Sequence, residues 1–163
     1  PEAPTIKDSN QATPDVIESA LTAEETISGP SEYEVMRTNS IAKKNRAIQT
    51  KLEKVISYTK QTMVAYMSEE DLNRLCTYVA EYSSGDTLQK ITPVKVDSQL
   101  KSIDIMHFGW NIGKAFGIKR IHTATFIKNV FAHTLRDLEI STIERKMSHT
   151  ESECYIKLQQ LKE

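Results

Sequence analysis

The chain has 163 residues and a formal net charge of -1, with 39% apolar and 26% charged residues. Its length suits one domain with a tail, and five Gly and five Pro exclude a collagen-like or low-complexity chain. No apolar run reaches the ~20 residues that span a bilayer, so we expect no membrane segment.

The net charge hides an uneven distribution along the chain. Residues 1–36 carry eight acids and one base, and residues 37–60 carry seven bases and one acid, while the remaining residues are balanced. Three interpretations stay open: a solvated tail and helix, a tail that folds over a basic face, or a basic face that binds an anionic partner.

The N-terminal part is predicted to be a tail followed by one long helix. Residues 1–31 are rich in Pro, Ser, Thr and acids, which predicts a disordered acidic tail with a weak helix over 14–21. Residues 32–67 read as a helix because apolar side chains recur on one face: Ile41, Ile48, Leu52, Val55, Ile56, Met63 and Met67.

Two further helices follow. Ser68 and Asp71 resemble a capping box that begins a helix over 69–83, which Ser83-Ser84-Gly85-Asp86 ends. Residues 86–97 are a connection in which Val94 and Val96 favour a short strand or an extended loop. A third helix over 98–116, capped by Asp97 or Ser98, is apolar over a wide arc and should be central. Its glycines would let another helix approach closely, and the last would end it in a left-handed cap: Gly109, Gly113 and Gly117.

The C-terminal part is predicted to hold a helix over 124–135 capped by Thr123, a helix over 140–148 and a strand over 153–158. We therefore expect an all-α helical bundle with a C-terminal helix-turn-helix or winged-helix-like part and at most one or two short strands. The predicted single domain, 32–163, contains a helical hairpin over 32–83 and the winged-helix-like part over 98–158.

Enzymatic motifs are absent from the sequence. It has no nucleophile elbow, phosphate loop or zinc-protease motif, so we expect no enzyme, no cofactor and no metal. Cys76 and Cys154 fit buried thiols of a cytoplasmic protein, and the polar N-terminal sequence does not resemble a signal peptide. The histidines are predicted to be structural or surface residues: His107, His122, His133 and His149.

Basic residues in the C-terminal part suggest a nucleic-acid interface. If 140–148 is a recognition helix, its exposed face would reach a DNA groove through Thr142, Arg145, Lys146 and His149. Phosphates would be held by Lys119, Arg120 and Lys128. Glu151 and Glu153 in the expected wing are unsuited to phosphate contact.

The run MHFGWNIGKAFGIKRIHTATFIKNVFAHTLRDLEISTIERKM resembles small proteins carried on bacterial mobile and conjugative elements. Its pattern is also similar to the C-terminal domain of winged-helix excision regulators of such elements. That resemblance implies a DNA-binding accessory or regulatory protein without catalytic residues.

Two functions remain open from the sequence. One is DNA binding through the C-terminal part. The other is a helical protein-interaction module without nucleic-acid binding, in which the amphipathic helix over 32–67 pairs with its own copy or with a partner helix.

Overall fold

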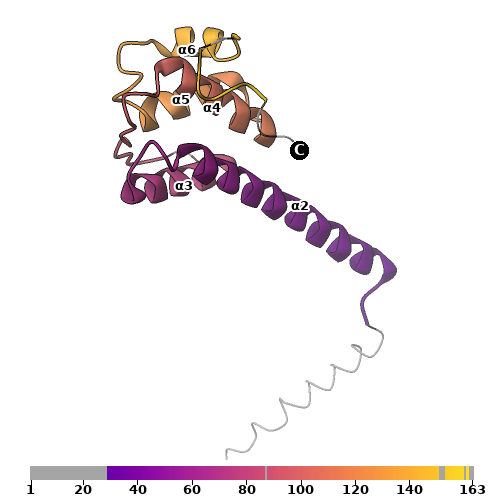
Figure 1. Cartoon of the computed structure of the whole chain (residues 1–163). Coiled ribbons are helices and arrows are strands. Elements are labelled where there is room, and N and C mark those ends of the chain that lie inside the picture. The colour runs from indigo at the N-terminus through magenta and orange to yellow at the C-terminus, as the bar shows by residue number, and fades with distance from the viewer. Residues whose placement is uncertain (1–28, 87, 151–152, 160, 162–163) are drawn as a thin grey trace, which may run out of the picture. The chain divides into compact units, whose positions relative to one another are not determined.

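The computed structural model describes residues 29–86, 88–150, 153–159 and 161, and within them the chain forms helices and no strand. The helices are α2 (Glu32–Met63), α3 (Glu69–Ser83), α4 (Ser102–Phe116), α5 (Arg120–Val130) and α6 (Ile140–Lys146) (Figure 1). The prediction of a mainly helical protein is confirmed. The predicted weak helix over 14–21 and the tail, apart from residues 29–31, lie outside the described residues.

The chain divides into two compact units, Pro1–Arg46 and Ala47–Glu163, and α2 runs from the first into the second. In the first unit, every described residue except the half-buried Ala42 is exposed. The second unit contains a single hydrophobic cluster that extends along the sequence from Val55 to Ile156. The apolar side chains that stabilise the fold by leaving water are therefore concentrated in the second unit.

α4 is the central helix of the second unit, as its wide apolar arc predicts. Ten of its fifteen residues are buried, and α5 packs against both α4 and α6. A Cβ atom at Gly109 would lie 2.8 Å from Cγ2 of Ile127, and one at Gly113 would lie 2.5 Å from Oγ1 of Thr123. The expected close approach of another helix to these glycines is confirmed, and the helix is α5.

Local capping sets several helix ends. The Ser68 hydroxyl accepts a hydrogen bond from the Asp71 N–H at 3.1 Å, and Gly117 has a φ of 71°, as predicted for the two caps. α4 begins at Ser102 and not at 98, because the Asp104 carboxylate accepts the Lys101 N–H at 2.9 Å. Asp97 instead closes a turn with the N–H of Gln99.

The predicted bounds of the fourth helix are wrong for a tertiary reason. α5 begins at Arg120, and Thr123 lies buried inside it, where its hydroxyl bonds to Tyr82 of α3. α5 ends at Val130, whose carbonyl oxygen accepts the N–H of Val94 at 2.9 Å. Residues 131–138 form turns, and the Lys128 ammonium donates to the carbonyl oxygens of Leu135, Arg136 and Leu138.

The predicted strand over 153–158 is also wrong. Three polar side chains of α4 form hydrogen bonds with the backbone of this segment, where a neighbouring strand would do so in a sheet. We call these three residues the C-terminal clasp: Asp104, His107 and Asn111. The Asp104 carboxylate accepts the N–H groups of Tyr155 and Ile156 at 2.6 and 3.0 Å. Asn111 donates to the carbonyl oxygen of Lys157 at 2.8 Å.

The central residue of the clasp contacts two carbonyl groups. The His107 ring nitrogens Nδ1 and Nε2 each lie 2.7 Å from a carbonyl oxygen, one of Ile156 and the other of His149. Residues 94–96 form no strand, so the loop alternative holds there.

Candidate nucleic-acid interface

Arg120 joins the start of α5 to the end of α6. Its guanidinium donates to the Ser148 hydroxyl at 3.1 Å and to the Glu144 carbonyl oxygen. A carbonyl at a helix C-terminus carries partial negative charge, so a cation is favourable there. The contact places the Arg120 guanidinium beside the last turn of α6, which carries two further bases, and Lys119 precedes Arg120 in the sequence. We call this set the basic junction: Lys119, Arg120, Arg145 and Lys146, all exposed.

A hollow of about 210 Å³ lies next to Arg120. Trp110 and Lys114 of α4 line it from one helix, and Met147 lines it from the end of α6. The Lys114 ammonium lies 5.0 Å from the centroid of the Trp110 ring, a cation–π contact. Lys114 therefore lies over the Trp110 ring, and this ring lines the same hollow as Lys114 and Arg120.

The other residues predicted from sequence differ in how they are placed. Thr142 is half-buried on α6, and His149 is exposed just beyond it. Lys128 is half-buried and donates to three carbonyl oxygens, so its ammonium is engaged in closing the turn after α5. We leave Lys128 out of the basic junction. Sequence reasoning could not find this role, because the three acceptors are backbone atoms seven to ten residues away.

Unneutralised cations characterise the basic junction. In the part of the chain that the structure describes, the ion pairs are those of Arg74 with Glu70 and Asp71. Lys119, Arg145 and Lys146 thus have no ion-pair partner among these residues. Their charges are available to an anionic partner in solvent.

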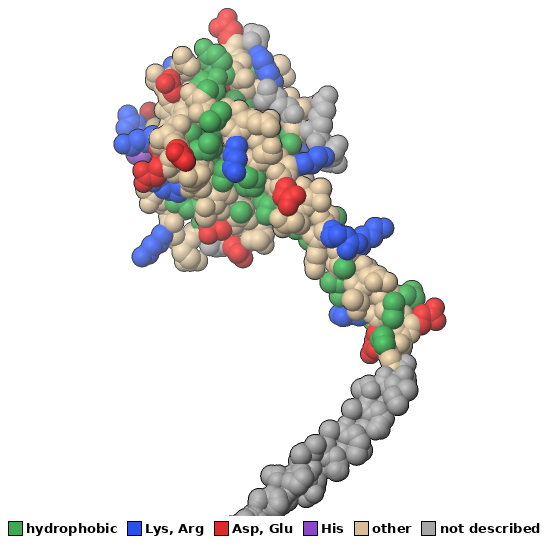
Figure 2. Space-filling view, turned by 60° about the horizontal axis from the view of Figure 1, so that its bottom comes forward, with side chains coloured by type: hydrophobic (Ala, Val, Ile, Leu, Met, Phe, Trp, Pro, Cys, Tyr) green, Lys and Arg blue, Asp and Glu red, His purple; other side chains and the backbone are tan. Residues whose placement is uncertain are grey.

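The surface of α2 combines basic and apolar side chains. Its bases are all exposed, and exposed apolar residues are interleaved with them along the helix (Figure 2). Tyr33 is 69% exposed, Met36 61% and Ile48 60%. Such large apolar side chains in water favour binding of a partner surface. The bases are Arg37, Lys43, Lys44, Arg46, Lys51, Lys54 and Lys60.

The described residues hold no group of three or more His, Cys, Asp or Glu side chains able to bind a metal ion. They also include no helix that is long and apolar enough to cross a bilayer. Burial raises the pKa of the Cys76 thiol, while the nearby Lys60 lowers it. A raised pKa reduces the thiolate fraction, and with it the nucleophilicity of Cys76 at neutral pH.

Comparisons of the chain with protein-family models, with curated proteins and with solved structures found no match.

Proposed function

We propose that the chain is a non-enzymatic DNA-binding accessory or regulatory protein of a bacterial mobile element, located in the cytoplasm. The observation that supports this proposal is the basic junction, where Arg120 holds the start of α5 against the end of α6. The cations of this surface would displace counterions from the phosphate backbone, which is the main source of non-specific affinity for DNA.

Within this proposal, α6 acts as the helix that reaches the groove. An α-helix with its side chains is about 10–12 Å across, which fits the ~12 Å width of a major groove. Arg145 and Lys146 would contact phosphates or guanine edges, and Thr142 and His149 would lie at the flanks. We also propose that this part is winged-helix-like. In it, the C-terminal clasp would take the place of a sheet in holding the segment after α6.

The test is fluorescence anisotropy of labelled duplex DNA at several salt concentrations. Arg145→Ala with Lys146→Ala should weaken binding for all sequences and lower the slope of log affinity against log salt by about 2, roughly one per phosphate contact. The control is Lys90→Ala with Lys95→Ala, which removes the same charge from exposed loop positions. Equal slopes for the two variants would reject the basic junction as the interface.

A second candidate function is supported by α2. Ile41 and Ile48 are 42% and 60% exposed and lie seven residues apart, whereas Val55, the next residue at this spacing, is buried in the core of the second unit. Seven-residue spacing is typical of a coiled-coil seam, and Asn45 would be the polar residue within it. Because such a seam is complementary to itself, the occupant of this face would be a second copy of the chain.

This candidate is tested by sedimentation equilibrium over a range of protein concentrations. Ile41→Asp with Ile48→Asp should abolish self-association. Thr50→Asp with Ser57→Asp, both exposed on the opposite side of α2, should leave it intact. A wild-type chain that stays monomeric at every concentration would exclude this pairing.

A further inference from the structure

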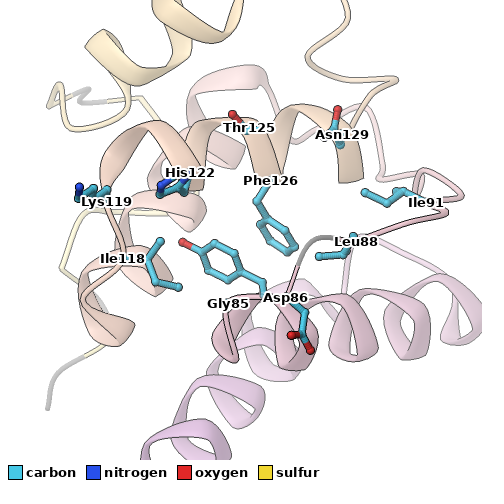
Figure 3. Close-up of a pocket in the computed structure, with 11 residues that line it drawn as sticks. Gly85, Asp86, Leu88, Ile91, Ile118, Lys119, His122, Thr125, Phe126 and Asn129 are labelled. Atoms are coloured by element: carbon cyan, nitrogen blue, oxygen red, sulfur yellow. The ribbon is translucent and has the colours of Figure 1, made fainter.

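A cavity of about 500 Å³ opens in the second unit between the end of α3, the loop that follows it and one face of α5 (Figure 3). Its volume lies within the roughly 300–1,000 Å³ of small-molecule sites in proteins. The cavity shares Lys119 with the basic junction, and its other lining residues belong neither to that junction nor to α2.

The floor of the cavity is aromatic and fixed. The rings of Tyr82 and Phe126 stack with centroids 4.2 Å apart and planes 19° apart, and each residue is only 5% exposed. The Tyr82 hydroxyl bonds to the hydroxyl of Thr123, so it is satisfied within the protein. Because the two rings cover each other and are nearly buried, the floor offers a small, rigid apolar surface, and the Tyr82 hydroxyl is already hydrogen-bonded.

The walls and the rim differ in character. Leu88, Ile91 and Ile118 are half-buried and line the cavity as apolar walls. Lys119 and His122, one helical turn apart and both exposed, lie at one end of the cavity, with Phe126 near its middle and Ile91 toward the other end (Figure 3). The cavity therefore has apolar walls and a basic end.

The charges around the cavity favour an anion at the end near α5. Lys119 and His122 belong to the first turn of α5 or to its cap, where the helix dipole is positive. The acid among the described lining residues is Asp86, whose carboxylate accepts a hydrogen bond from the Ser84 hydroxyl at 2.9 Å. Thr125 and Asn129 add neutral hydrogen-bonding groups along α5.

We propose that this cavity binds a small aromatic anion, with its ring against the Tyr82–Phe126 floor and its carboxylate near Lys119 and His122. The fixed rings favour a flat partner by offset stacking or edge contact, and the basic end selects the sign of its charge. The proposal does not depend on DNA binding or on pairing of α2.

The test uses naphthoate as the probe, with naphthylmethanol as its neutral analogue, naphthylmethylammonium as its cationic analogue and decanoate as an aliphatic anion. Dissociation constants are measured by calorimetry on the full chain, and the site is located by amide NMR shifts. We expect naphthoate to bind about tenfold more tightly than the neutral analogue, a difference of ~1.4 kcal/mol. Decanoate and the cation should bind more weakly, and the shifts should concentrate on residues 82–91 and 118–129.

Lys119→Gln with His122→Gln should remove the preference for naphthoate over naphthylmethanol and leave the affinity for naphthylmethanol unchanged. The matched control is Lys90→Gln with His133→Gln, which alters the same residue types at exposed positions outside the lining. The proposal is overturned if naphthoate does not bind at its solubility limit, if the neutral analogue or decanoate binds equally well, or if the shifts lie elsewhere.

Discussion

Asp104 is the side chain through which α4 holds the end of the chain. It is 1% exposed, and its carboxylate accepts the backbone N–H groups of Lys101, Tyr155 and Ile156. One buried charge therefore both caps a helix and replaces a strand partner. His107 and Asn111, one and two turns further along α4, repeat this use of a buried polar group.

Asp104→Ala should cost roughly 3 kcal/mol of unfolding free energy, because it leaves up to three N–H groups without their acceptor, two of them in the segment after α6. Urea unfolding measures this cost. Asp97→Ala is the control, since Asp97 is exposed and serves one turn, and it should cost less than about 1 kcal/mol. Equal costs for the two variants would show that the clasp does not stabilise the fold.

Tyr82 links stability to alkaline pH. Burial raises its pKa to about 12, although the hydrogen bond with Thr123 lowers it. The unfolded chain ionises this phenol near pH ~10 and the folded chain only near 12, so the unfolded state binds fewer protons between these values. Stability should therefore fall from about pH 10 to 12, by about 3 kcal/mol from Tyr82.

The measurement is urea unfolding at a series of alkaline pH values for the wild type and for Tyr82→Phe. The variant keeps the ring and loses the ionisable group, so its stability should fall less steeply over this range. The variant should also be less stable at neutral pH because it lacks the hydrogen bond, but this loss is the same at every pH and does not change the slope. Parallel pH profiles would contradict the assignment of this linkage to Tyr82.

At the scale of elements, the contact of α4 with α5 depends on two glycines. A Cβ atom at Gly109 would meet two methyl groups of Ile127, at 2.8 and 2.9 Å. In an exposed helix, replacing Gly by Ala stabilises by roughly 0.5–1 kcal/mol, but here the two helices must separate or Ile127 must move.

Gly109→Ala should therefore destabilise the protein, by about 1–3 kcal/mol. Combined with Ile127→Ala, which removes the opposing methyl groups, its cost should shrink or change sign. A double-mutant cycle measured by thermal or urea unfolding gives the coupling between the two positions. Strict additivity would show that the helices do not meet at these side chains.

The same elements show how far the sequence predicts the fold. The predicted bounds of α3 are correct because the residues that end it are local: Ser68 caps its start, and Ser84, followed by Gly85 with a φ of 83°, caps its end. The predicted bounds of α5 are wrong because both ends depend on residues distant in sequence. Thr123 bonds to Tyr82, and the Val130 carbonyl oxygen accepts the N–H of Val94. Alternating apolar residues over 153–158 suggest a strand. The C-terminal clasp prevents this strand, and in the sequence it shows only as three polar residues on an otherwise apolar helix.

The candidate site is likewise predicted in part. Charge alone identifies the bases of α5 and α6 as a group. It does not reveal that Arg120 joins the two helices or that Lys128 is used to close a turn, since both depend on backbone carbonyl positions. The cavity beside α5 has no sequence signal, because its lining comes from two stretches far apart in the chain, within residues 82–91 and 118–129.

At the scale of the whole molecule, the two units contrast in what stabilises them. The second has a hydrophobic cluster, whereas in the first every described residue except Ala42 is exposed. A helix without tertiary burial relies on its own hydrogen bonds, and helices shorter than about 12–15 residues are marginal in water. The fifteen residues of α2 that belong to the first unit should therefore open far more often than α4.

Amide hydrogen exchange on the full chain tests this expectation. At low protein concentration, amides of residues 36–46 should have opening free energies below about 1 kcal/mol. Buried amides of α4 should exchange only when the whole protein unfolds. If α2 pairs with a second copy, protection of residues 36–46 should rise with protein concentration, and Ile41→Asp with Ile48→Asp should remove that rise. Strong protection at low concentration would instead show that a surface within the same chain covers this part of α2.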